Sequence, residues 1–74
     1  MNTQACQNLA NEIIIKAVKD YRAALRRQAR NPDSPKAKHD IYEIERFFRS
    51  EWFSCLTEIS GEYLIRRLRE EVGA

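Results

Sequence analysis

The chain of 74 residues contains little of several residue types on which common functional sites depend. It has two glycines, two prolines, two cysteines and one histidine. Gly61 and Gly73 cannot make the glycine-rich loop that cradles a phosphate group. Two cysteines are too few for the disulfide framework of a small secreted domain. The shortage of glycine and proline also predicts few turns and long regular elements.

The scarcity of nucleophiles and metal ligands argues against catalysis. His39 is the only histidine and falls on a polar helix face, where it is expected to be solvated. Cys6 and Cys55 fall on apolar helix faces and are expected to be buried, so neither should form a reactive pair or a zinc site with His39. No motif of a serine hydrolase, nucleotide triphosphatase or metalloprotease is present. We therefore predict a protein that is not an enzyme, with no catalytic, cofactor-binding or metal-binding residues.

Long hydrophobic runs are also missing. The longest aliphatic run covers residues 13–15, far short of a membrane span. The N-terminus lacks a basic region followed by an apolar segment, so we expect no signal peptide, no membrane contact and a location in the cytoplasm. Apolar residues make up 43% and charged residues 32%, as in a soluble globular domain, and the length predicts a single domain over residues 1–74. The net charge of +2 is too small to indicate a nucleic-acid partner strongly.

The spacing of apolar residues predicts an all-α fold, a small antiparallel helical bundle. Two long helices are expected over residues 4–30 and 35–57, and a short C-terminal helix over residues 61–72. Ser34 and the proline after it should open the second helix, and a serine before Gly61 should open the third. Ser50 could instead cap a separate short helix, which would break the second helix there.

The second helix carries apolar side chains on two faces. One face follows helical spacing through Ala37, Ile41, Ile44, Phe48, Trp52, Cys55 and Ile59. Tyr42 and Phe53 lie roughly opposite. The short last helix should leave part of this surface bare, so one of the aromatic rings could anchor a partner or a second copy of the chain. Alternatively, all the rings fill a core from two sides. The candidate apolar interface consists of Ile15, Tyr42, Trp52 and Phe53.

A row of basic residues marks one side of the first helix. The basic stripe consists of Lys19, Arg22, Arg26 and Arg30, and no acidic residue lies between Tyr21 and Arg30. Ile15 lies toward the same side. A phosphate backbone or an acidic protein groove could be its target. A solvated face that complements the helix C-terminus is the simpler interpretation.

The acidic residues look like partners in ordinary solvated ion pairs. Several stand one turn from a basic residue on the same helix, as in Glu12–Lys16, Glu45–Arg49, Glu62–Arg66 and Arg67–Glu71. A helix-turn-helix with residues 62–71 as the recognition helix is a further alternative. Three acids in that segment would face DNA phosphates, which argues against it.

Three segments of the chain resemble short uncharacterised reading frames of bacteriophages and prophages of Firmicutes, particularly Clostridia. The matching patterns are Arg46-Phe47-Phe48-x-Ser50-x-Trp52-Phe53-x-x-Leu56-Thr57, Gly61-Glu62-Tyr63-Leu64-Ile65-x-x-Leu68-Arg69 and Val18-Lys19-Asp20-Tyr21-Arg22-x-Ala24-Leu25. The resemblance implies no functional residue. It implies a phage accessory protein inside a bacterial host cell.

These observations lead to two functional hypotheses. The first is a phage or prophage accessory protein that binds a host or phage protein, with inhibition of a host defence or regulatory complex as a role that suits the phage context. The second is a small nucleic-acid-binding module that uses the basic stripe. Self-association into a homo-oligomer is compatible with either.

Overall fold

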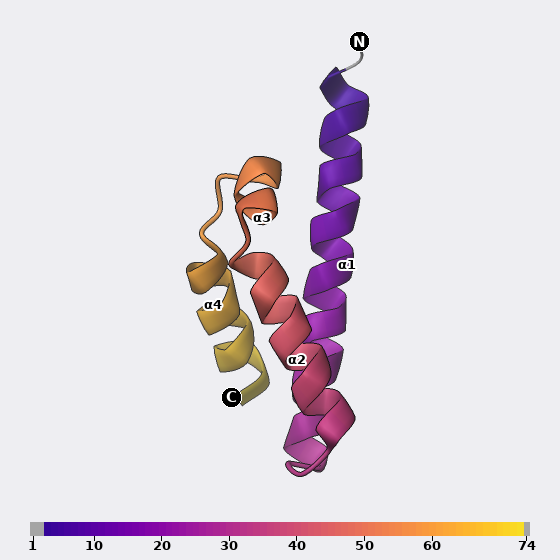
Figure 1. The fold of residues 1–74 in the computed structure, drawn as a ribbon, viewed down its shortest axis with the longest axis vertical. Coiled ribbons are helices and arrows are strands. Elements are labelled where there is room, and N and C mark those ends of the chain that lie inside the picture. The colour runs from indigo at the N-terminus through magenta and orange to yellow at the C-terminus, as the bar shows by residue number, and fades with distance from the viewer. Residues whose placement is uncertain (1–2, 74) are drawn as a thin grey trace.

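The computed structural model describes the backbone of residues 3–73 and the side chains of residues 10–73. The helices are α1 (Thr3–Arg30), α2 (Pro35–Phe48), α3 (Glu51–Leu56) and α4 (Gly61–Gly73) (Figure 1). No strand occurs in the described range, so the all-α prediction is confirmed. The molecule is elongated, with extents of 47 × 20 × 19 Å, because α1 alone is about 42 Å long.

The connection between α1 and α2 forms as the sequence predicts. The backbone N–H of Ala37 donates to the Ser34 side-chain oxygen at 3.3 Å, and Pro35 takes the first position of the helix. A proline fits there because its missing N–H would have no partner within the helix. The connection over residues 31–34 is short, so α2 runs back along α1 in the antiparallel direction (Figure 1).

The continuous helix expected over residues 35–57 does not form, and this part of the prediction is wrong. Instead, α2 ends at Phe48 and α3 starts at Glu51, as in the alternative with a cap at Ser50. The Ser50 hydroxyl donates to the carbonyl oxygen of Phe47 at 2.6 Å and accepts from the N–H of Phe53 at 3.2 Å. One side chain thereby satisfies a free N–H at the start of α3 and adds a second hydrogen bond to the Phe47 carbonyl, which also accepts from the Ser50 backbone N–H at 3.1 Å.

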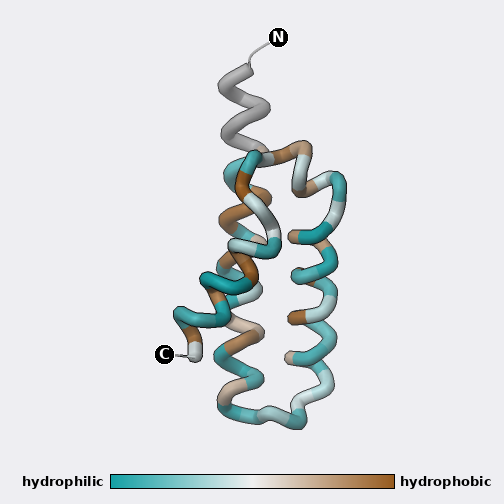
Figure 2. The backbone as a smooth tube through the Cα atoms, turned by 90° about the vertical axis from the view of Figure 1, so that its left-hand side faces the viewer, coloured by the Kyte–Doolittle hydropathy of each residue, from teal (hydrophilic) through white to brown (hydrophobic). Residues whose placement is uncertain are grey.

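The start of α4 lies against the end of α2 because Gly61 has no side chain. A Cβ atom at Gly61 would lie 1.9 Å from the carbonyl oxygen of Phe48. The N–H of Tyr63 donates to the Ser60 side chain at 3.4 Å, which confirms Ser60 as the cap of α4. From this point α4 runs antiparallel to α2 and packs on one side of the α1–α2 pair (Figures 1 and 2).

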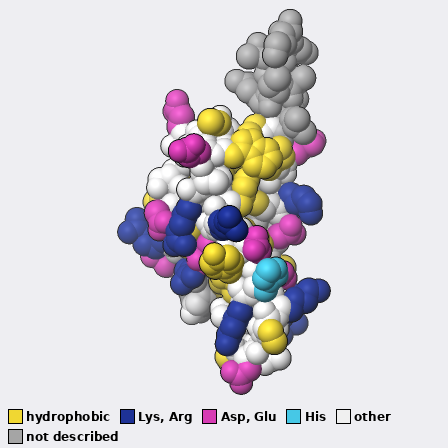
Figure 3. All heavy atoms as spheres, viewed as in Figure 1, with side chains coloured by type: hydrophobic (Ala, Val, Ile, Leu, Met, Phe, Trp, Pro, Cys, Tyr) yellow, Lys and Arg dark blue, Asp and Glu magenta, His cyan; other side chains and the backbone are white. Residues whose placement is uncertain are grey.

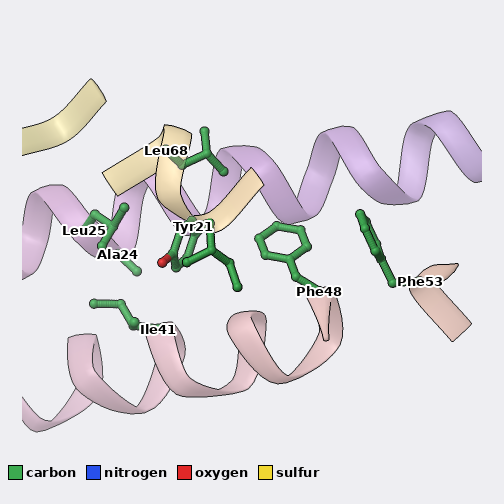
Figure 4. Packing of buried hydrophobic residues seen from close by; sticks show 8 residues of the cluster. Tyr21, Ala24, Leu25, Ile41, Phe48, Phe53 and Leu68 are labelled. Carbon is green, nitrogen blue, oxygen red and sulfur yellow. The ribbon is translucent and has the colours of Figure 1, made fainter. Parts of the chain in front are cut away.

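Three aromatic residues form the centre of the core (Figure 4). The Tyr21 ring packs edge-on against Phe48 at 5.6 Å, and Phe48 packs against Phe53 at 5.4 Å. All three side chains are almost fully buried. Apolar side chains from α1, α2 and α4 close around them, namely Ala24, Leu25, Ile41, Ile65 and Leu68.

The break at Ser50 changes which residues reach this core. Trp52, Cys55 and Ile59 were expected to continue the buried face of α2, but all three are exposed. Phe53, expected on the opposite face, is 1% exposed and takes the core position. A separate α3 has its own orientation, so the helical spacing counted from α2 no longer applies after residue 50.

Candidate binding surfaces

A polar cluster joins α1, α2 and α4. Its centre, Tyr21 and Glu45, is buried, while the Arg69 side chain that completes it is 56% exposed. The Tyr21 hydroxyl donates to Glu45 Oε2 at 2.6 Å and accepts from Arg69 Nε at 3.1 Å. Arg69 also donates to Glu45 Oε2 through Nε and through Nη2. Glu45 is only 8% exposed, so the sequence-based interpretation of it as a solvated carboxylate is wrong.

The cluster keeps its charges at neutral pH. Burial by itself raises the pKa of the Glu45 carboxyl group, but the hydrogen bonds from Tyr21 and Arg69 and the charge of Arg69 outweigh it and lower that pKa. Hydrogen bonds to Glu45 and Tyr21 raise the pKa of Arg69. Burial, together with the hydrogen bond to Glu45, raises the pKa of Tyr21 to about 12. The cluster is therefore an ion pair with a neutral phenol, and it serves to hold the three helices together.

The basic stripe lies on the side of α1 that faces α4. Arg22 Nε lies 3.0 Å from Glu71 Oε2 on α4, which fixes that side. Lys19, Arg26 and Arg30 are exposed and form no ion pair with any side chain in residues 10–73. The carboxylate of Glu71 therefore lies within the stripe, beside Arg22.

Ile15 belongs to this same surface. It lies two helical turns before Arg22, and residues at that spacing share a face. Its side chain is 52% exposed. An apolar side chain therefore stands at one end of the basic stripe.

The four residues of the predicted apolar interface do not form one surface. Phe53 is in the core and is excluded. Tyr42 is 62% exposed and lies two turns before Arg49, which faces α4 through its ion pair with Glu62. Tyr42 therefore lies at the α2–α4 side of the molecule.

Trp52 lies on a third side. Its ring packs edge-on against Phe47 at 5.8 Å. Phe47 lies two turns after Asp40, which faces α1 because its carboxylate is 3.8 Å from Arg27 Nη1. Trp52, 59% exposed, therefore lies at the α1–α2 side, away from α4.

The ion pairs differ from those that sequence spacing predicts. The Glu45–Arg49 pair occurs, at 3.5 Å. Two other acids bridge helices instead of pairing along one: Glu62 pairs with Arg49, and Glu71 with Arg22. Glu62 thus connects α4 to the end of α2, and Glu71 connects it to α1.

The helix-turn-helix alternative gains no support from α4. Ile65 and Leu68 of this helix are buried, and Arg69 is bound to Glu45. Arg66 and Arg67 are exposed beside the acids that argue against DNA contact.

The residues considered for catalysis stay apart. His39 is exposed on α2, and Cys55 is exposed on α3, which corrects the expectation that Cys55 is buried. The Cys6 side chain lies outside the described residues. Within residues 10–73, no three side chains of histidine, cysteine, aspartate or glutamate come together as metal ligands would. None of the helices described is long and apolar enough to cross a membrane.

Comparison with known proteins adds no family to these observations. No protein-family model, no curated protein and no solved structure matches the chain. The phage context inferred from the sequence stays a prediction.

Proposed function

We propose that this chain is a non-enzymatic accessory protein that binds an acidic protein partner through the α1 face formed by Ile15 and the basic stripe. The observation that carries the proposal is Ile15, 52% exposed at one end of the stripe. Interfaces commonly combine an apolar anchor with arginines that reach carboxylates on the partner. The resemblance to phage proteins suggests a host or phage protein as the partner, in the cytoplasm of the host bacterium.

The composition of the face supports a protein rather than a nucleic acid as the ligand. Glu71 lies within the stripe, bound to Arg22 at 3.0 Å. A phosphate backbone would be repelled by this carboxylate, whereas a protein can present a basic or polar group to it. Ile15 would gain nothing from a phosphate group but can enter an apolar pocket on a protein.

Capture from a lysate of a Firmicutes host tests the proposal. The wild-type chain should retain a stoichiometric protein partner, and Ile15→Ser and Arg26→Glu should each lose it. Lys38→Glu, the same change of charge at an exposed position of α2, is the matched control and should retain the partner. Capture of no stoichiometric protein, or equal capture by Arg26→Glu, would contradict the proposal.

A nucleic-acid-binding module is the second candidate, because Lys19, Arg26 and Arg30 have no ion pair among the described side chains. Fluorescence anisotropy with duplex and single-stranded DNA across a salt series distinguishes the two. Contacts with three or four phosphates predict that log K falls with log salt at a slope of about −3. A flat curve, or no binding, removes this candidate.

A further inference from the structure

The two sides of the α1–α2 pair are covered unequally. On one side α4 packs into the angle between the helices (Figures 1 and 2). On the other side lies a surface hollow of about 380 Å³, which we name the open groove. It is lined by Asp20, Ala23, Ala24 and Arg27 of α1 and by Lys36, Asp40, Glu43 and Ile44 of α2.

Aromatic side chains extend the open groove toward α3. Phe47 lies one turn after Glu43 and so continues the α2 wall of the groove. The Trp52 ring packs on Phe47 and is 59% exposed. Figure 3 shows hydrophobic side chains gathered on the surface where α3 meets α1, with basic and acidic side chains both present along the edge below them.

We propose that a second copy of this chain occupies the open groove, related to the first by a two-fold axis that runs along the helices. The α1–α2 pairs of the two copies then face each other. Together they form the four central helices of a dimer, and each α4 stays on the outside. The proposal concerns a different face from the basic stripe and does not depend on the proposed function.

The charges of the open groove favour a copy of itself. The Arg27–Asp40 contact shows that these two residues lie at the same height along the molecule. Glu43 lies one turn from Asp40 and has no ion pair among the described side chains. A two-fold axis along the helices keeps every residue at its height and sets α1 of one copy against α2 of the other. Arg27 of each copy then faces the carboxylates of Asp40 and Glu43 on the other copy.

The balance of charge separates this surface from the rest of α1. The open groove carries bases and acids on both walls, so two copies can meet without an excess of like charge. The basic stripe has four cations in a row and would repel its own copy. Of the two faces of α1, only the open groove is electrostatically complementary to itself.

The same symmetry brings the aromatic ends together. Because heights are preserved, the Trp52–Phe47 end of one groove meets the Trp52–Phe47 end of the other. Each exposed indole is then covered by apolar side chains, and burial of such rings near an interface centre contributes strongly to affinity. An antiparallel arrangement would instead set Trp52 against the polar turn at residues 31–34 and would leave it exposed.

Sedimentation equilibrium of the full chain over a range of concentrations tests the dimer. We expect a mass that rises toward twice the 8.7 kDa of one chain. Trp52→Ala should raise the dimer dissociation constant about 30-fold or more. Ala23→Glu places a charged side chain inside the groove at an exposed helical position and should have a comparable effect. Circular dichroism should show that both variants keep the wild-type helix content.

Tyr42→Ala is the matched control. Tyr42 is as exposed as Trp52 but lies at the α2–α4 side, so its removal should leave the dissociation constant within about threefold of wild type. A wild-type chain that stays monomeric at its highest soluble concentration would overturn the proposal and leave the groove to a helix of another protein. A dimer that Tyr42→Ala weakens as much as Trp52→Ala would overturn it too, because the contact would then use another face.

Discussion

The two sides of the α1–α2 pair differ in how completely they are covered, because the chain has only one further helix, α4, long enough to cover a side. On the α4 side, a buried tyrosine and a buried glutamate meet an arginine of α4 in a polar cluster, and two further ion pairs join α4 to its neighbours. On the other side, Arg27 and Asp40 make a single long contact at 3.8 Å, and Trp52 is largely exposed. One short helix can seal only one side. The sealed side therefore determines the fold, and the open side is available for association.

The largest loss of stability should come from the aromatic residues of α3, where the buried Phe53 and the exposed Trp52 are neighbours. Phe53→Ala should lower the free energy of unfolding by about 3–5 kcal/mol, because it leaves a cavity beside Phe48. Trp52→Ala should lower it by less than about 1 kcal/mol in the monomer. Urea unfolding at a concentration where both chains are monomeric measures the difference, and equal losses would mean that Trp52 is also part of the core.

The next largest loss of stability should come from the polar cluster of Tyr21, Glu45 and Arg69. Glu45→Ala leaves the Tyr21 hydroxyl without its acceptor and Arg69 without its carboxylate, and we expect a loss of about 2–4 kcal/mol. Glu62→Ala removes the exposed pair with Arg49 and should cost much less, because water screens that pair. If chemical unfolding shows similar costs for the two variants, the cluster does not hold the α4 side together in the way described.

Alkaline pH should weaken the same side. Tyr21 has a folded-state pKa of about 12 against an ordinary value of 10.0, so its contribution to stability is complete below pH 10 and is lost as pH rises toward 12. The loss should be about 2–3 kcal/mol. Thermal unfolding from pH 8 to pH 12 should show this decline in the wild-type chain and a smaller one in Tyr21→Phe. Parallel curves would exclude Tyr21 as the titrating group.

The contribution of Glu45 to stability should depend on pH in the opposite direction, with a loss in acid rather than in alkali. Hydrogen bonds and cationic charge lower the pKa of Glu45 in the folded chain, so its contribution is present above about pH 4.5 and is lost as pH falls through the lowered value. The difference in stability between the wild-type chain and Glu45→Ala should therefore shrink in acid. A difference that stays constant from pH 7 to pH 2 would contradict this account.

The smallest effect concerns the contact between α4 and the end of α2. Gly61→Ala would set a methyl group against the Phe48 carbonyl oxygen, and α4 would have to shift at a cost of about 1–3 kcal/mol. Gly73→Ala is the control, because a Cβ there meets nothing within 4 Å and should be neutral or slightly stabilising. A Gly61→Ala chain as stable as Gly73→Ala would show that α4 does not pack so closely.

Local chemistry was readable from the sequence where a single residue decides the outcome. Ser34 and Ser60 cap their helices as predicted, since the cap depends on a side chain and the next few backbone groups. The break at Ser50 was harder to predict, because apolar spacing continues through it from Phe48 to Trp52. What decides it is the Ser50 hydroxyl, which serves both helix ends at once.

The burial of Glu45 could have been predicted from its spacing, but its interpretation as a partner of Arg49 in an exposed ion pair obscured this. Ile41, Glu45 and Phe48 follow helical spacing, so Glu45 lies within the buried stripe of α2. Pairing it with Arg49 explained its charge but not that position. The separation of Ile15, Tyr42 and Trp52 onto three sides could not be predicted, because it depends on where α4 packs rather than on any spacing within one helix.

The fluorescence of Trp52 reports on whether the open groove is covered in a dimer, since Trp52 is the only tryptophan in the chain. With the wild-type chain diluted through the range in which its mass halves, the emission should shift from shorter to longer wavelength as the indole becomes exposed. If the dimer buries Trp52, this shift and the fall in mass should share one midpoint. An emission maximum that stays at the wavelength of an exposed indole at every concentration would contradict it.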